Sequence, residues 1–151
     1  GFASRNLQPF AGQDIRTLFA DEKAAENTVE ETLRFDAPLH MFTRYAYEDV
    51  DFGNGIVVKE GDSIGLLLGM ANRDPSAFAE PDSFLPDRPD QKNVSFGAGI
   101  HFCIGAPLAR LELQTSLKVL FERYPGLRAV EEPTYRNSFH FHGLERLMVT
   151  V

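Results

Sequence analysis

Cys103 is the only cysteine of the chain, and it lies in the glycine-rich stretch "SFGAGIHFCIG" at residues 95–105. His101 precedes it by two positions, and glycines stand on both sides of the pair. A long helical pattern begins directly after this stretch, and the N–H groups and dipole of a helix N-terminus favour a thiolate. Glycines allow left-handed backbone and a close approach to a flat or bulky group. The stretch therefore predicts a thiolate that acts as a nucleophile or binds a metal.

Other interpretations of the same residues are weaker. A lone cysteine is most often a small buried hydrophobe. The segment "GAGIHF" is not a dinucleotide fingerprint, because Phe102 stands where a third glycine is needed. A Cys–His nucleophilic pair lacks an evident acid to orient the imidazole. A zinc site has the right ligand types, although the spacings differ from those of zinc fingers. Its ligands would be Cys103, His101, His140 and His142, the last two on one face of a strand.

Composition limits the possible partners. With 151 residues, 43% hydrophobic and 25% charged, the chain is expected to be one globular domain or a fragment of one. A net charge of −7 argues against nucleic acid or an anionic membrane as partner. The longest apolar run, Ile64–Ala71, is too short to cross a bilayer, and no signal-peptide pattern precedes it. One cysteine cannot form an internal disulfide, so we expect a cytoplasmic protein.

A helix is predicted over residues 10–34 from the spacing of apolar residues. Thr28 and Glu31 have the spacing of a capping box, and Asn27 is an equally good N-cap, so a helix N-terminus is expected near them. Pro38 ends the helix, because the residue before a proline avoids helical geometry.

Strands are predicted from Met41 to Leu68. β-favouring runs alternate there with turns at residues 53–55 and 60–62. The following stretch, residues 71–93, is rich in Pro, Asp and Asn and should form a loop with short helical turns at most. Loops of this length are usually functional or well packed.

A second long helix is predicted over residues 106–124, with Pro107 in its first turn. The tail alternates enough to predict a hairpin with Gly143 at or near its turn. The expected fold class is therefore α+β, mainly helical.

The segment "FGAGIHFCIGAPLARLE" resembles the cysteine-ligand loop of the cytochrome P450 family, the heme-thiolate monooxygenases. "ETLR" is similar to the ExxR pair of that family, and "FLPDR" to its later arginine. "FTRYA" and "ANRDPSAF" also resemble bacterial members in the right order, so the similarity runs from about Asn27 to the C-terminus. The family pattern FxxGxHxCxG is matched by Phe96, Gly99, His101, Cys103 and Gly105, with Gly97 at the usual second glycine.

The resemblance implies a role for each matching residue. Cys103 would be the axial thiolate of heme b (iron protoporphyrin IX), the electron donor that favours O–O cleavage. His101 and Arg44 would contact the heme propionates, and Phe96 would pack near the sulfur. A Glu–Arg pair three residues apart on a helix is usually an exposed surface pair. The resemblance implies instead a buried structural network of Glu31, Arg34 and Arg88.

The resemblance also implies partners. The complete enzyme would take electrons from a ferredoxin or similar redox protein and insert one oxygen atom of O2 into a small organic substrate. Basic residues near the cysteine would steer the donor. Arg110, Lys118 and Arg123 are candidates, although a solvated helix face is the commoner interpretation of such residues.

The chain covers less than half of a typical family member. "AGQDI" at residues 11–15 superficially resembles the AGxxT signature of the oxygen-activating helix, but Ile15 replaces the threonine and the segment lies too close to Glu31. We therefore expect the C-terminal heme-binding part of the fold without the distal helix. Substrate-facing positions would be Leu39, His40, Met41, Phe42, His140 and Phe141.

An alternative follows from the uncovered heme face. A porphyrin with one face bare would bind weakly or require a partner chain. The chain would then be inactive alone, as a fragment of a full enzyme, or a truncated, non-catalytic paralogue that is heme-free and self-associates.

Overall fold

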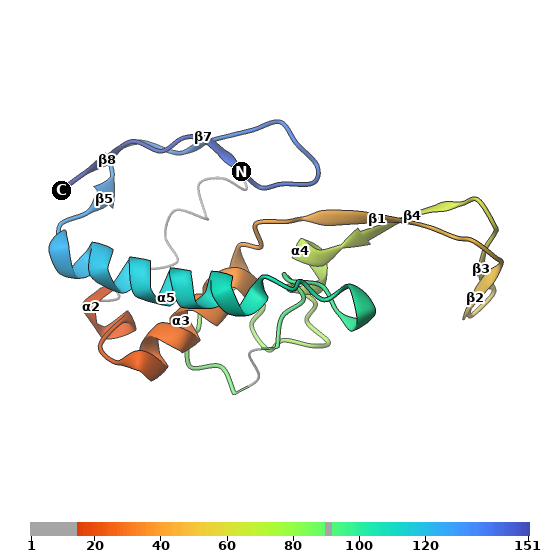
Figure 1. Cartoon of the computed structure of the whole chain (residues 1–151), viewed down its shortest axis with the longest axis horizontal. Coiled ribbons are helices and arrows are strands. Elements are labelled where there is room, and N and C mark those ends of the chain that lie inside the picture. The colour runs from red at the N-terminus through yellow and green to blue at the C-terminus, as the bar shows by residue number, and fades with distance from the viewer. Residues whose placement is uncertain (1–14, 90–91) are drawn as a thin grey trace.

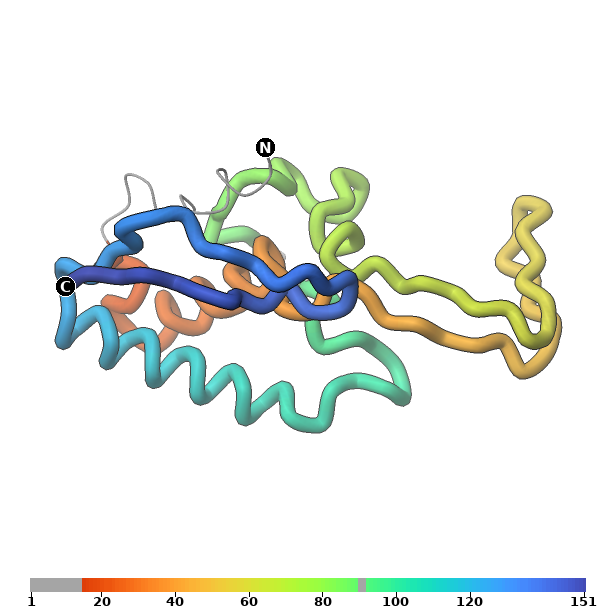
Figure 2. Tube along the Cα trace, turned by 90° about the horizontal axis from the view of Figure 1, so that it is seen from above, coloured from red at the N-terminus to blue at the C-terminus, as the bar shows by residue number. Residues whose placement is uncertain are grey.

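The computed structural model describes residues 15–89 and 92–151. Two long helices lie side by side, α3 (Glu22–Phe35) and α5 (Ala106–Arg123), and the short helix α2 (Ile15–Leu18) contacts both (Figure 1). The strands of the tail run above the helices in the view of Figure 1. A two-stranded ribbon extends away from the helices and ends in a small hairpin (Figures 1 and 2).

The helical core is formed by side chains from all three helices. Leu18, Phe19 and Ala25 are buried, and Leu117 and Phe121 of α5 pack against them. The rings of Phe19 and Phe121 stack with centroids 5.6 Å apart. Burial of these apolar groups holds α2 and α3 against α5.

The first predicted helical segment is divided into α2 and α3 by a turn at residues 19–21, and neither helix begins near Thr28. Helix α3 begins at Glu22, where Asp21 is the N-cap and its Oδ1 accepts a hydrogen bond of 2.8 Å from the N–H of Ala24. Thr28 lies inside the helix and donates its hydroxyl to the carbonyl of Leu18, which fixes the preceding turn. The capping-box prediction was wrong because a tertiary partner, not a helix end, uses this hydroxyl. Residues 10–14 of the predicted helix, and nearly all of "AGQDI", lie outside the described residues.

The predicted strands and turns are confirmed. β1 (Met41–Tyr45) pairs with β4 (Ser63–Leu67), and β2 (Val50–Gly53) pairs with β3 (Ile56–Val58), both antiparallel. Asn54 has a φ of 52° and joins β2 to β3 between two glycines with positive φ, as this turn requires. Leu68 belongs not to a strand but to the short helix α4 (Leu68–Ala71). Residues 72–93 contain only turns and irregular backbone where they are described.

Helix α5 confirms the second predicted helix, with a proline in its first turn. In the tail, β6 (Thr134–Tyr135) pairs with β7 (Leu144–Arg146), so Gly143 ends the connection between the two strands, as predicted. A second ladder, β5 (Arg128–Ala129) with β8 (Val149–Thr150), was not predicted and ties the C-terminus to the end of α5. The fold class is α+β.

Among the residues that the structure describes, no helix combines the length and the apolarity that crossing a bilayer requires.

Candidate functional site

The cysteine loop, residues 95–105, presents Cys103 directly before the first turn of α5. The N–H of Cys103 donates to the carbonyl of Phe96 over 2.9 Å, which closes the loop on itself. Gly97 and Gly99 have φ values of 74° and 66°, a conformation that residues with a Cβ rarely adopt. A short 3-10 helix η1 (Gly99–His101) forms the tip. The loop therefore holds an exposed thiol just before the N-terminus of an 18-residue helix.

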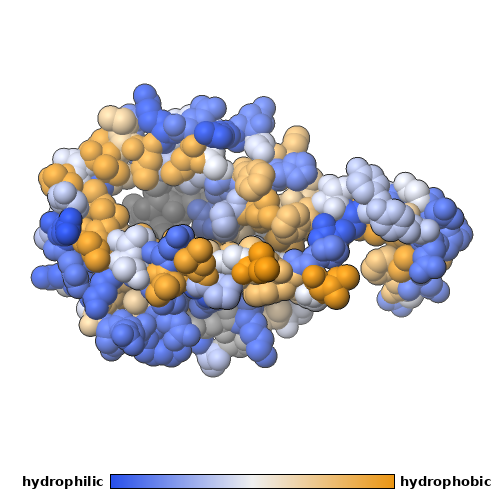
Figure 3. All heavy atoms as spheres, viewed as in Figure 1, coloured by the Kyte–Doolittle hydropathy of each residue, from blue (hydrophilic) through white to orange (hydrophobic). Residues whose placement is uncertain are grey.

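Exposed apolar side chains flank Cys103 along the chain. Ile100 and Ile104 are 98% and 100% exposed, and Phe102 and Leu108 are about half exposed or more. These four residues are the cysteine-side patch. Figure 3 shows apolar side chains gathered over the cysteine loop and along α5. An apolar patch of this kind usually marks a surface that a ligand or another chain covers. A cysteine sulfur within an apolar surface would suit a porphyrin, whose iron the sulfur would hold.

The two predicted propionate contacts lie on different elements. His101 is exposed at the end of η1. Arg44 is partly buried on β1, where its guanidinium lies 5.4 Å from the ring centroid of Phe42 and Nη1 donates to the carbonyl of Thr43. Both side chains can supply donors to an anionic group.

The structure brings Glu31, Arg34 and Arg88 together in the interior. Arg34 binds Glu31 through two hydrogen bonds of 2.7 and 2.8 Å, and Nε of Arg88 donates to the same carboxylate over 3.1 Å. The N–H of Leu85 also donates to it. Glu31 and Arg34 are 1% exposed and Arg88 is 9% exposed.

Both arginines also bind the long loop. Arg34 donates to the carbonyls of Asn72, Pro81 and Ser83. Arg88 donates to the carbonyls of Ala79, Glu80 and Ser83. Because buried charges are stable only when paired and hydrogen-bonded, this network fastens residues 72–88 to α3.

Sequence reasoning missed a second buried link. Asn72 is fully buried, and its side chain donates to the hydroxyl of Ser95 and accepts from the N–H of Val94. The hydroxyl of Ser95 donates in turn to the carbonyl of Leu33 in α3. This link holds the start of the cysteine loop against α3. The asparagine of "ANRDP" was the available signal, but nothing in its spacing indicated a partner 23 residues away.

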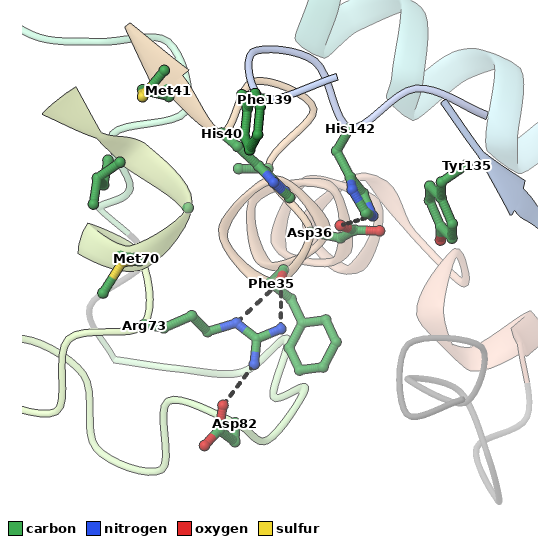
Figure 4. Close-up of a pocket in the computed structure, with 13 residues that line it drawn as sticks. Phe35, Asp36, His40, Met41, Met70, Arg73, Asp82, Tyr135, Phe139 and His142 are labelled. Carbon is green, nitrogen blue, oxygen red and sulfur yellow. Dashed lines mark hydrogen bonds and ion pairs between the residues drawn. The ribbon is translucent and has the colours of Figure 1, made fainter. Parts of the chain in front are cut away.

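The two predicted substrate-facing segments lie side by side. The N–H of His40 donates to the carbonyl of His140 over 2.8 Å, and Leu39 forms a bridge with Phe141. A cavity of about 620 Å³ opens beside this junction (Figure 4). His40 and Met41 line it, whereas the other predicted positions, Leu39, Phe42, His140 and Phe141, do not. Its lining also includes residues that the sequence did not single out, among them Phe35, Asp36, Met70, Arg73, Phe139 and His142.

An acid and two histidines meet in this cavity. The rings of His40 and His142 stack with centroids 4.4 Å apart and planes 17° apart, and Tyr135 stacks on His142 at 4.1 Å. Nε2 of His142 lies 3.4 Å from a carboxylate oxygen of Asp36. Burial, and then the neighbouring His142, lower the pKa of His40, while Asp36 opposes the shift. Burial, and then Asp36, raise the pKa of Tyr135.

This cluster is arranged for stacking more than for chelation. Ligand atoms of Asp36, His40 and His142 lie within 4.8 Å of one another. Imidazole binds a metal in the plane of its ring, and two nearly parallel rings do not direct their nitrogens to one point. The zinc ligand set considered from the sequence is not assembled, because within residues 15–89 and 92–151 His142 groups with Asp36 and His40, not with Cys103.

The basic residues of α5 differ in their surroundings. Arg110 is turned inward, and its guanidinium binds both carboxylate oxygens of Glu30. This hydrogen bond raises the pKa of Arg110, an effect that burial opposes. A solvated helix face is therefore the wrong description of Arg110. Lys118 is partly buried and Arg123 is exposed.

The comparisons with known proteins agree on one family. The family model "Cytochrome P450" matches residues 21–138. The chain is 46% identical over 123 residues to the biotin biosynthesis cytochrome P450 of Bacillus subtilis, covering 81% of this chain and 31% of that protein. It is 39% identical over 132 residues to the 6-deoxyerythronolide B hydroxylase of Saccharopolyspora erythraea, covering 85% of this chain and 32% of that protein.

Solved structures show the same likeness. The structure of P450BioI in complex with an acyl carrier protein that carries hexadec-9Z-enoic acid superposes with a TM-score of 0.87 at 39% identity, over 98% of this chain and 39% of that one. Ligand-free CYP164A2 of Mycobacterium smegmatis gives a TM-score of 0.87 at 39% identity, over 99% of this chain and 38% of that one. The chain thus spans about a third of the length of the curated relatives it matches.

Proposed function

Because the chain belongs to the cytochrome P450 family, we propose that it is the C-terminal heme-thiolate portion of a monooxygenase and that Cys103 is the axial ligand of a heme b. The observation that carries the proposal is the placement of Cys103: an exposed thiol at the N-terminus of α5, within the cysteine-side patch. Heme supplies the activation of O2 when it is bound. The task of this chain is to hold the sulfur ligand and to cover one porphyrin face.

The surrounding residues support distinct contributions. The bond from the Cys103 N–H to the Phe96 carbonyl orients the loop ahead of the N-terminus of α5. The cysteine-side patch provides an apolar surface for the ring. Arg44 and His101 are proposed to bind the propionates, because a guanidinium and an imidazole both donate to carboxylates.

The substrate class and the electron donor are also proposed. The apolar cavity beside the junction of residues 38–42 and 138–142 suits a small organic substrate, with His40 and Met41 at its wall. A ferredoxin or similar redox protein is proposed to approach the cysteine side. Arg123 is exposed but lies at the far end of α5 from Cys103, so it is not proposed to contact that partner. The cytoplasm is the proposed compartment.

The carbon monoxide difference spectrum of the reduced, heme-loaded protein tests the ligand. We expect a red-shifted band that Cys103→Ala abolishes, whereas Ser116→Ala, an exposed hydroxyl on the outer part of α5, should leave the band unchanged. A wild-type protein that takes up no heme, or a Cys103→Ala variant that keeps the band, would contradict the proposal.

A second candidate function is also favoured by the cysteine-side patch. A heme-free, non-catalytic chain would bury that surface against another copy of itself. Sedimentation of the heme-free protein should then show a dimer or larger species that Ile104→Ser weakens. A monomer that binds heme with one-to-one stoichiometry would exclude this candidate.

A further inference from the structure

Arg110 and Glu30 connect the two long helices beside the cysteine loop. Nε and Nη2 of Arg110 donate to Oε1 and Oε2 of Glu30, the second over 3.1 Å. Their side chains are 28% and 14% exposed. A two-point contact between a guanidinium and a carboxylate, partly shielded from water, is stronger and more directional than a surface ion pair.

The same guanidinium also covers the first residue of the loop pattern. The Cζ of Arg110 lies 4.7 Å from the ring centroid of Phe96, which is the geometry of a cation–π contact. The carbonyl of Phe96 accepts the N–H of Cys103. Arg110 is therefore one contact and one hydrogen bond away from the residue that carries the thiol.

Glu30 holds the entry of the loop as well. Nδ2 of Asn93 donates to the carboxylate of Glu30 over 3.1 Å, and Oδ1 of Asn93 accepts the N–H of Ser95. One carboxylate on α3 thus binds the segment before the loop and the helix after it. A pair of this kind restrains both ends of a glycine-containing loop, in addition to the Asn72–Ser95 link and the bond from the Cys103 N–H to the Phe96 carbonyl.

We propose that Glu30 and Arg110 form a clamp that positions Phe96 and thereby the Cys103 loop. Arg110 is a positioning residue: it acts through Phe96 and does not touch the sulfur. Its guanidinium is engaged inside the molecule, so steering of a redox partner is not its principal role. The consequence for heme ligation rests on the proposed function, whereas the restraint on the loop does not.

Amide hydrogen exchange in the heme-free chain tests the restraint directly. Arg110→Lys keeps the positive charge but cannot make the two-point contact or lie flat on Phe96. We expect the Cys103 amide to exchange roughly tenfold faster in this variant, as local opening becomes easier. Glu30→Gln should give a similar increase, and the double variant should add little to either single change, because the two residues act as one unit.

Two controls separate the clamp from general destabilisation. Glu26→Gln removes a carboxylate from an exposed pair on the same helix and should leave the Cys103 amide unchanged. The Tyr124 amide, bonded to the Leu120 carbonyl at the other end of α5, is an internal reference. The proposal is overturned if the Cys103 amide is unchanged in Arg110→Lys and Glu30→Gln, or if the Tyr124 amide accelerates equally.

The heme-loaded protein provides the second readout. Arg110→Lys and Glu30→Gln should convert part of the red-shifted carbon monoxide band to a blue-shifted form, whereas Arg128→Lys, an exposed arginine outside the clamp, should not. Full retention of the red-shifted band in both clamp variants would overturn the role in ligation. If the wild-type chain shows no heme band, the proposed function fails, and the exchange experiment still decides whether the clamp exists.

Discussion

The Glu31 network and the cysteine loop differ in how far their side chains are buried and paired. The network of Glu31 buries three charges and satisfies them with each other and with backbone carbonyls of the chain itself. The cysteine loop leaves Ile100 and Ile104 almost fully in solvent. The first region completes its own interactions, so it can define the fold. The second requires another surface, so it indicates where a ligand or partner belongs.

The largest expected loss of stability is in the Glu31 network. Glu31→Gln leaves Arg34 and Arg88 buried without a compensating charge, and we expect it to lower the free energy of unfolding by about 3–5 kcal/mol. Denaturant titration of the heme-free chain measures this loss. Glu26→Gln, in an exposed pair on the same helix, is the matched control and should cost at most about 1 kcal/mol. Equal losses in the two variants would show that the network contributes no more than a surface pair.

A smaller loss is expected at the start of the helix that carries the network. Asp21→Ala removes the N-cap of α3 and leaves the N–H of Ala24 without its acceptor. Removal of such a cap costs about 1 kcal/mol. Denaturant titration should show this loss for Asp21→Ala and a much smaller one for Asp21→Asn, which can still accept the bond. If the two variants lose the same stability, the cap does not set the helix N-terminus.

The histidine stack should make stability depend modestly on pH. Burial lowers the pKa of His40 below its ordinary value of 6.5, so the unfolded chain binds the proton more readily than the folded one. This contribution is fully present above about pH 6.5 and is lost as the pH falls below that value. The groups that face His40 are His142, Asp36 and, across the stack, Tyr135.

Denaturation midpoints measured between pH 5 and 8 (roughly the range in which histidine titrates) check this expectation. The midpoint should fall towards the acid end, and the fall should be smaller in His40→Gln. His140→Gln is the matched control, since His140 is exposed. If the denaturation midpoint of His40→Gln depends on pH as it does in the wild type, the histidine stack does not contribute to the pH dependence of stability.

The smallest effect on stability is expected in the cysteine-side patch. Ile104→Ser replaces a fully exposed side chain and should change the free energy of unfolding by less than about 0.5 kcal/mol. The same variant should reduce the binding of an apolar fluorescent dye to the heme-free chain. A large loss of stability would mean that Ile104 packs within this chain, and the contrast between the two regions would disappear.

Local patterns in the sequence predicted most elements of the fold. The Gly-Asn-Gly turn, the strands around it, helix α5 and the tail hairpin are confirmed, because each depends on neighbours within a few residues. The start of α3 was wrong because Thr28 uses its hydroxyl on Leu18, ten residues away. The ladder between β5 and β8 was missed because strands of two residues carry no readable period.

At the site, the sequence by itself determined which residues are present for chemistry: one cysteine in a glycine loop before a helix, and the motifs that identify its family. Only the tertiary structure decided which of them act together. It joined Asn72 to Ser95, Arg110 to Glu30, and the segment at His40 to the tail at residue 140. Hydrogen bonds between residues distant in the chain depend on how the elements pack, and one sequence contains no local signal for them.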